Sequence, residues 1–182
     1  NGCAYSLYNI ITPKVGLSYI ENMNFSKIVQ QDYTLSSGLG GLHHGTNTVE
    51  MANAYSTLEN HGEYRQADCI SSILDASGNE IYEEPESKTV YTRSASDQMT
   101  DILEGVLNSS AGTAKGLKWS SASDVAAAAK TGTTNDNNVA WFCGYTPYYT
   151  ISVWVGYDYP KSVKGLWGNT YPAYIWKEAM LY

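Results

Sequence analysis

Apolar and polar residues alternate near the C-terminal end of the chain in the pattern typical of a β-strand. Within residues 149–157, every second residue from Ile151 to Val155 is β-branched and apolar. Successive side chains of a strand point to opposite faces, so a period of two predicts a strand with one apolar face. An apolar run also covers residues 139–145, and the intervening Thr146-Pro147-Tyr148 is typical of a turn. We therefore expect residues 139–145 and 149–157 to pair as a β-hairpin.

Helical spacing of apolar residues is clearest over residues 49–60. The apolar residues that would lie along one side of this helix are Met51, Ala52, Tyr55 and Leu58. Asn47 before the helix and Glu50 three positions later form a capping-box pattern, which marks a helix start. Further helices are expected over residues 15–24, from Ser96 to about Asn108, and over residues 171–181.

The remaining segments predict a second hairpin and two loops. The turn sequence Asp75-Ala76-Ser77-Gly78 separates residues 65–74 from residues 79–82, which predicts paired strands on either side of it. Residues 34–48 and 109–124 are rich in small and polar residues and predict loops. This mixture of antiparallel hairpins and helices predicts an α+β fold, an antiparallel β-sheet flanked by helices.

Length and charge narrow the class of protein. A chain of 182 residues is long enough to bury a core, and we expect residues 1–182 to form a single domain. The net charge of −7 argues against nucleic acid as a partner, because binding phosphates requires clustered Lys and Arg. No apolar run approaches the roughly 18 residues that span a bilayer.

The cysteines and histidines predict neither a disulfide framework nor a metal site. Cys3, Cys69 and Cys143 lie far apart, and an odd count does not build a framework of bridges. No pair has metal-ligand spacing, and the histidines do not combine with the cysteines in a zinc pattern. We expect three free cysteines, no metal, and no chemical role for the loop residues His43 and His44.

The strongest chemical signal is the run Lys130-Thr131-Gly132-Thr133-Thr134. In a strand, Thr131 and Thr133 would share one face, and Lys130 and Gly132 the other. Two hydroxyl groups near an ammonium group can hold a carboxylate, and Gly132 lets a ligand approach the backbone closely. An unpaired N–H at Thr133 would then donate to an oxyanion. The run therefore predicts an anion-binding site on a strand.

Three blocks of residues carry a resemblance to a known family. The first block comprises Leu39-Gly40-Gly41-Leu42, Gly45, Val49-Glu50-Met51-Ala52, Ala54-Tyr55, Asn60 and Gly62. The second is Gly112-Thr113-Ala114-Lys115, and the third is the Lys130–Thr134 run followed by Trp141-Phe142-Cys143-Gly144-Tyr145-Thr146-Pro147. In content, order and approximate spacing these blocks resemble the transpeptidase domain of class A, bifunctional penicillin-binding proteins. The resemblance covers about residues 15–157 and implies the C-terminal part of a penicillin-binding protein and serine β-lactamase-like transpeptidase fold.

The alanines at positions 126–129 present a conflict between local propensity and the resemblance. Their intrinsic propensity favours a helix. The resemblance makes them the start of the K-T-G strand, and their small side chains would let a large element pack against it. In the family that element is the helix that carries the nucleophile. We therefore expect a strand.

The resemblance assigns a role to each residue of the run. Lys130 would supply positive charge and help relay protons. Thr131 and Thr133, with Gly132 and Thr134 beside them, would bind the carboxylate of a substrate. The N–H of Thr133 would form half of an oxyanion hole. Gly112-Thr113 would either shape the rim of the site or form a plain turn.

The family's nucleophile motif, S-x-x-K, is missing from the chain. No lysine is preceded by serine at the third position before it. The second family motif, S-x-N, is represented by its last residue at most. Asn1-Gly2-Cys3-Ala4 resembles the asparagine of that motif and the residues that follow it. The alternatives for Asn1 are a frayed terminus, or Ser6-Leu7-Tyr8-Asn9 as the motif, with a spacing that differs by one residue.

The resemblance implies acyl transfer in peptidoglycan synthesis. A serine would attack the D-Ala-D-Ala amide of a stem peptide, and an amine would resolve the acyl-enzyme into a cross-link. β-Lactams would acylate the same serine, and the reaction would need no metal or other cofactor. The expected partners are stem peptides, β-lactams and the missing N-terminal part of the same domain, on the extracytoplasmic face of a bacterial membrane. This chain alone is expected to be inactive.

Two other interpretations stay open. A serine β-lactamase or D,D-carboxypeptidase shares the K-T-G motif and the fold. A non-catalytic extracellular carbohydrate-binding module would use exposed aromatic residues, and Trp141, Trp154 and Trp167 are candidates for stacking on sugars. Packing within the sheet or core is the competing role for Trp141 and Trp154.

Overall fold

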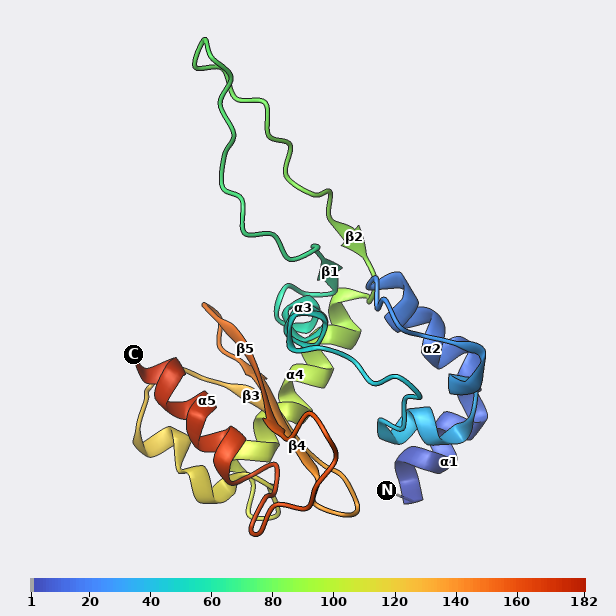
Figure 1. The fold of residues 1–182 in the computed structure, drawn as a ribbon. Helices are drawn as coiled ribbons and strands as arrows, with labels where there is room; N and C mark the ends of the chain where they lie inside the picture. The colour runs from blue at the N-terminus through green and yellow to red at the C-terminus, as the bar shows by residue number, and fades with distance from the viewer. Residues whose placement is uncertain (1) are drawn as a thin grey trace.

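A three-stranded antiparallel sheet with helices on both faces forms the main body of the protein (Figure 1). The computed structural model describes residues 2–182, so the prediction for Asn1 lies outside the described residues. The strands are β3 (Ala128–Thr133), β4 (Val139–Tyr145) and β5 (Thr150–Gly156), in the order β3-β4-β5. The helices are α1 (Gly2–Ile11), α2 (Pro13–Asn22), α3 (Thr48–Glu59), α4 (Arg93–Asn108) and α5 (Tyr171–Leu181). The predicted α+β class is confirmed.

The hairpin of β4 and β5 confirms the period-two pattern. Phe142 pairs with Val153 across the two strands, and both side chains face α5. The turn is closed by Thr146, whose N–H donates to the carbonyl of Tyr149 at 2.9 Å. Strand β4 has the predicted bounds, whereas β5 begins and ends one residue inside residues 149–157.

The core lies between the sheet and α5. Trp176 is fully buried, and its ring centroid lies 5.1 Å from those of both Trp119 and Phe142. Its indole N–H donates to the carbonyl of Gly144 at 3.1 Å, so the polar atom of this large side chain has a partner. On the other face of the sheet, α3 packs through Tyr55 against Tyr145.

Helix α3 and its cap follow the sequence closely. The Asn47 side chain accepts from the N–H of Glu50 at 2.9 Å, as a capping box requires. The Glu50 carboxylate does not complete the box, because it accepts from Ser26 and Thr46 instead. It thereby holds the preceding loop against the helix.

Several predicted bounds are wrong. Helix α4 begins at Arg93, not Ser96, because the Thr92 hydroxyl accepts from the N–H of Ala95 and caps the helix one turn earlier. Helix α1 was not predicted, and α2 begins two residues before the predicted position 15. The two expected loops contain short 3-10 turns at Leu35–Leu39, Lys115–Leu117 and Trp119–Ser121.

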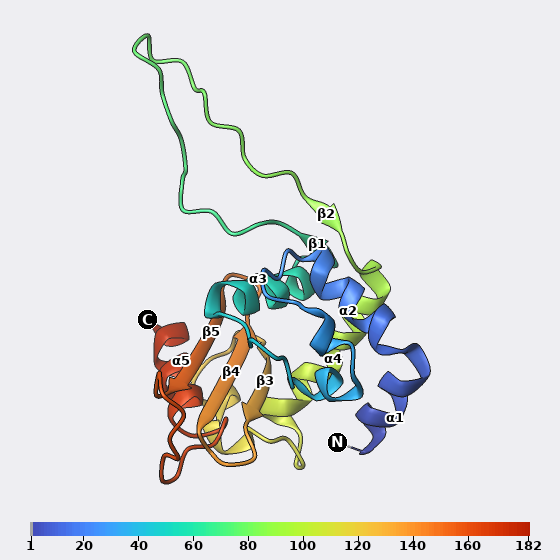
Figure 2. The same ribbon diagram turned by 45° about the vertical axis from the view of Figure 1, so that its right-hand side comes forward.

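The predicted hairpin around Asp75 is a long arm that projects from the body (Figure 2). Only β1 (Glu63–Tyr64) and β2 (Lys88–Thr89) at its base and one bridge between Leu74 and Glu80 near its tip are paired. The turn itself is as expected, with the Asp75 carboxylate accepting three hydrogen bonds from Ser77 and Asn79. The flanking strands are missing because a two-stranded ribbon without a covering layer is marginal in water.

Three observations concern the other sequence predictions. Cys3, Cys69 and Cys143 are free. No helix among residues 2–182 is long and apolar enough to cross a membrane. No group of three or more His, Cys, Asp and Glu side chains in the same part of the chain is arranged to hold a metal ion.

Replacing Trp176 by alanine is expected to lower the free energy of unfolding by about 3–5 kcal/mol, because it empties the centre of the core. Chemical denaturation of the protein that contains this chain measures the loss. Trp167→Ala is the matched control, since Trp167 is 53% exposed and its removal should change the free energy by no more than about 0.5 kcal/mol. Equal losses of stability for the two variants would contradict the position of Trp176 at the centre of the core.

Candidate active site

The K-T-G run forms the outer strand of the main sheet. Residues Ala128 and Ala129 are buried, on opposite faces of β3, against Leu103 and Leu107 of α4. Tertiary packing therefore overrides the helical propensity of these two alanines. The strand predicted over residues 126–129 begins only at Ala128, and the helix packed against it is α4 of this chain. Beyond Ala129, β3 pairs with β4 only, and no other strand of residues 2–182 pairs with its second edge.

The backbone groups of Thr131 and Thr133 point to this unpaired edge. The N–H of Thr134 donates to the carbonyl of Val139, its partner in the ladder, at 3.0 Å. Hydrogen-bonded and non-hydrogen-bonded pairs alternate in an antiparallel ladder, so the groups of Thr133 and Thr131 face away from β4. The edge therefore presents the N–H of Thr133, as the sequence predicted for an oxyanion donor.

Lys130 lies on the opposite face of the strand from the two threonine side chains. Its ammonium group donates to the carbonyl of Thr131 at 2.8 Å and so lies at the same edge. Partial burial among neighbouring side chains lowers the pKa of Lys130, although the residue as a whole remains exposed. The facing Cys143 is buried, and burial raises the pKa of its thiol to about 11, so this thiol is not an activated nucleophile.

The two threonine hydroxyls are held by residues far away in the sequence. The hydroxyl oxygens of Thr131 and Thr113 are 2.9 Å apart. The hydroxyl oxygen of Thr133 accepts from the N–H of Gly168 at 2.9 Å. Thr134 differs, because its hydroxyl accepts from the N–H of Val139 and closes the turn between β3 and β4.

The loop 165–170 is the part of the site that sequence reasoning missed. It packs across β3, and a Cβ atom added to Gly168 would lie 2.7 Å from the carbonyl oxygen of Gly132. The neighbouring Asn169 donates through its side chain to the carbonyl of Thr113 at 3.0 Å. The loop therefore binds both the K-T-G strand and the Gly112-Thr113 turn. A glycine next to a polar residue was the only local signal.

Lys130 and Thr113 also line one hollow of about 300 Å³ beside the end of α4. This hollow opens next to the unpaired edge of β3. Because Lys130 and Thr113 both line it, the hollow is the route by which an anionic ligand would approach the edge.

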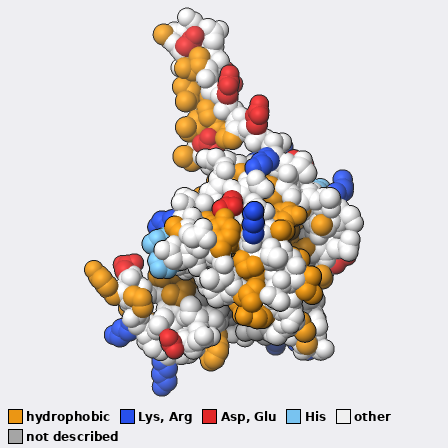
Figure 3. Space-filling view, turned by 90° about the vertical axis from the view of Figure 1, so that its right-hand side faces the viewer, with side chains coloured by type: hydrophobic (Ala, Val, Ile, Leu, Met, Phe, Trp, Pro, Cys, Tyr) orange, Lys and Arg blue, Asp and Glu red, His pale blue; other side chains and the backbone are white. Residues whose placement is uncertain are grey.

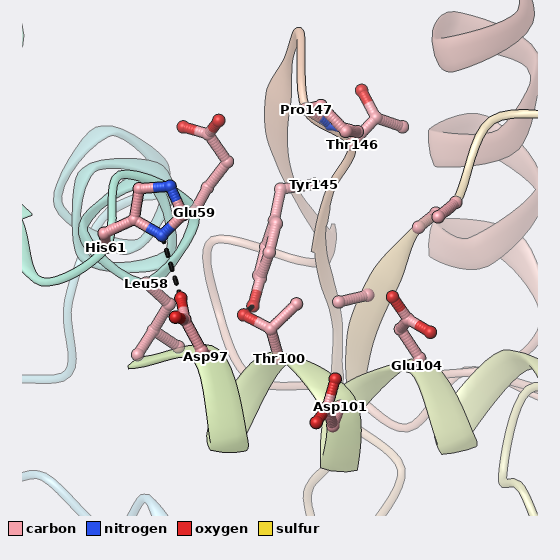
Figure 4. A pocket seen from close by; sticks show the side chains of 13 residues that line it. Leu58, Glu59, His61, Asp97, Thr100, Asp101, Glu104, Tyr145, Thr146 and Pro147 are labelled. Atoms are coloured by element: carbon pink, nitrogen blue, oxygen red, sulfur yellow. Dashed lines mark hydrogen bonds and ion pairs between the residues drawn. The ribbon is translucent and has the colours of Figure 1, made fainter. Parts of the chain in front are cut away.

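A second hollow of about 340 Å³ lies between α3, α4 and the turn after β4 (Figure 4). Its wall contains the carboxylates of Glu59, Asp97, Asp101 and Glu104. His61 is paired with Asp97 at 2.8 Å, and burial raises the pKa of Glu59. These side chains would repel a carboxylate, and no residue of the Lys130–Thr134 run lines this hollow. The edge of β3 is therefore the better candidate for anion binding.

The tryptophans do not form one sugar-binding platform with the site. Trp141 and Trp154 are directly opposite each other in β4 and β5, on the α3 face of the sheet. The Trp167 side chain is exposed in the loop 165–170. His43 and His44 are exposed loop residues, and the backbone N–H of His43 donates to the buried carboxylate of Asp32 at 2.6 Å.

Comparison with known proteins identifies the family and the fold. The family model described as penicillin binding protein transpeptidase domain matches residues 16–181. Penicillin-binding protein 4 of Bacillus subtilis is 35% identical over 161 residues, which are 88% of this chain and 25% of that protein. Penicillin-binding protein 1A of Clostridium botulinum is 33% identical over 183 aligned residues, 99% of this chain and 21% of that protein.

The solved structures show the same fold. The crystal structure of penicillin-binding protein 1A from Haemophilus influenzae matches with a TM-score of 0.77 at 18% identity, covering 98% of this chain and 32% of that chain. This chain thus spans between a fifth and a quarter of the length of the two relatives above. The family match over residues 16–181 shows that the chain belongs to the penicillin-binding protein transpeptidase family, and the relatives named above are of the class A kind.

Proposed function

We propose that this chain supplies the K-T-G side of the active site of a peptidoglycan D,D-transpeptidase. The observation that supports this proposal best is the unpaired edge of β3, where the N–H of Thr133 and the ammonium group of Lys130 face the same opening. An oxyanion that forms during acyl transfer needs N–H donors placed in advance at such an edge. The family's name supports β-lactams as ligands of the same site.

The residues of the run divide the chemistry between them. The N–H of Thr133 forms half of the oxyanion hole, and the hydroxyls of Thr131 and Thr133 bind the substrate carboxylate. Lys130 provides positive charge and exchanges protons with the reacting groups. Its lowered pKa suits this role, because an ammonium group that is closer to neutrality releases its proton more readily.

The nucleophile comes from sequence outside this chain. No lysine here has a serine three positions before it, so the S-x-x-K segment belongs to another part of the parent protein. Its serine attacks the D-Ala-D-Ala amide, D-Ala leaves, and an acceptor amine then attacks the acyl-enzyme. We place Asn1 at the end of the second motif, S-x-N, and the parent protein on the extracytoplasmic side of the cell membrane.

The surface beside α1 and α2 supports the docking of that missing part. The exposed large apolar side chains on these two helices are Tyr5, Leu7, Ile10, Ile11, Val15 and Tyr19. Figure 3 looks onto this side of the molecule and shows hydrophobic side chains gathered on the body. Exposed apolar area of this kind favours burial under another protein layer.

Fluorescent penicillin tests the proposal directly. The parent protein should form a stable covalent adduct, and the isolated 182-residue chain should form none because it lacks the serine. Lys130→Met in the parent protein should slow acylation by about 10²–10⁴-fold. Lys161→Met, an exposed lysine in the segment after β5 and away from the proposed docking surface, is the matched control and should react like the unchanged protein. A covalent band on the isolated chain would contradict the proposed division of the site.

Gly168→Ala tests whether the loop 165–170 supports the strand. The added Cβ cannot lie 2.7 Å from the carbonyl oxygen of Gly132, so the loop must shift and release the Thr133 hydroxyl. We expect acylation by penicillin to slow by about tenfold, the effect of one lost hydrogen bond together with misplacement of the strand. Stopped-flow acylation of the parent protein measures it. Gly116→Ala is the control, because its Cβ meets no atom within 4 Å; if both variants react normally, the loop does not support the site.

A further inference from the structure

The contacts of the threonine hydroxyls determine which protons are free to bind a ligand. A hydroxyl group has one proton to donate and can accept through its lone pairs. The hydroxyl oxygen of Thr133 already accepts from the N–H of Gly168, so its own proton remains available. The hydroxyls of Thr131 and Thr113 share one hydrogen bond, in which one of them donates its proton to the other. The proton of the accepting hydroxyl stays free to donate to a third group.

A carboxylate accepts hydrogen bonds and cannot donate them when it is ionised. If a carboxylate binds at Thr131, the Thr131 proton must point to it. Thr131 must then accept from Thr113, which makes a chain from the Thr113 hydroxyl through the Thr131 hydroxyl to the ligand. Such chains polarise each bond and strengthen the terminal bond to the anion.

Thr113 is fixed in place from both sides of its turn. The N–H of Ala114 donates to the carbonyl of Val106 in α4 at 3.0 Å. Gly112 lies so close to α4 that an added Cβ would be 2.4 Å from the carbonyl oxygen of Gly105. Asn169 donates to the carbonyl of Thr113 from the opposite side at 3.0 Å. The hydroxyl of Thr113 therefore stays beside Thr131 before any ligand arrives.

We propose that Thr113 is a positioning residue that orients the hydroxyl of Thr131 toward the carboxylate of the substrate or β-lactam, and that Asn169 holds Thr113 in place for this purpose. The inference rests on the proposed transpeptidase function. It assigns to the Gly112-Thr113 turn a role in recognising the ligand's negative charge. A plain turn at this position would have no effect that depends on the ligand's carboxylate.

The test compares two ligands that differ in that charge and in one added methyl group. Acylation rates of the parent protein are measured with benzylpenicillin and with its methyl ester, in which the carboxylate is masked. Thr113→Val keeps the shape of the side chain but removes the hydroxyl. We expect this variant to react with benzylpenicillin about fivefold more slowly, the effect of one hydrogen bond, and with the ester at an unchanged rate.

Two further variants complete the experiment. Thr113→Ser retains the hydroxyl and should restore the rate with benzylpenicillin. Thr113→Val added to Thr131→Val should cause no further loss, because the two hydroxyls act through one chain. If Thr113→Val fails to fold, Asn169→Leu should show a smaller loss that is again confined to benzylpenicillin.

The outcomes separate this inference from the proposed function. Equal slowing with both ligands would show that Thr113 is only structural, and an unchanged rate with benzylpenicillin would show that it plays no part; either result overturns the inference and leaves the proposed function standing. Failure of the unchanged parent protein to react with benzylpenicillin would overturn the proposed function, and the inference with it.

Discussion

The candidate site depends on the pairing of β3 with a single neighbouring strand. Pairing with β4 fixes the direction of every backbone group in the Lys130–Thr134 run, so the groups of Thr131 and Thr133 must face outward. Ala128 and Ala129 at the start of β3 pack against α4. A strand with neighbours on both edges would have used the N–H of Thr133 in its ladder, and the proposed oxyanion donor would be lost.

An unpaired edge is normally a liability, because it can recruit another strand. Here the ammonium group of Lys130 bonds to the exposed carbonyl of Thr131. A charged side chain at the edge discourages pairing with another sheet. This hydrogen bond satisfies the carbonyl of Thr131 and leaves the N–H of Thr133 without a partner in the ladder. The edge therefore offers a donor and a positive charge, which favour an incoming anion. In the proposed site, protection from pairing and the attraction of negative charge thus come from the same residue, Lys130.

How much could be predicted from the sequence depended on the range of the interaction. The β4–β5 hairpin and the cap at Asn47 follow from patterns that span a few residues, and both are confirmed. The Thr133–Gly168 contact joins residues 35 positions apart, and no periodicity or turn signal encodes it. The prediction of strands on either side of Asp75 was wrong for a related reason. Residues with strand propensity form a sheet only when another layer packs against them, and this segment has none. The roles of Thr131, Gly132, Thr133 and Thr134 in binding a carboxylate, and the catalytic roles of Lys130 and Thr133, stay predictions.

Apolar packing and individual hydrogen bonds both hold the site in place, but they tolerate substitution to different degrees. The position of β3 depends on buried area around Trp176, where other apolar residues of similar volume could serve. In the proposed site, the direction of the hydroxyl protons depends on single contacts with the Thr113 hydroxyl and the N–H of Gly168, and at position 168 a side chain would clash with Gly132. A transpeptidase must place hydroxyl protons and one N–H toward negative charge before the substrate binds, since reorienting them during the reaction would add to its barrier. The constraint on this part of the chain therefore lies in hydrogen-bond direction more than in packing.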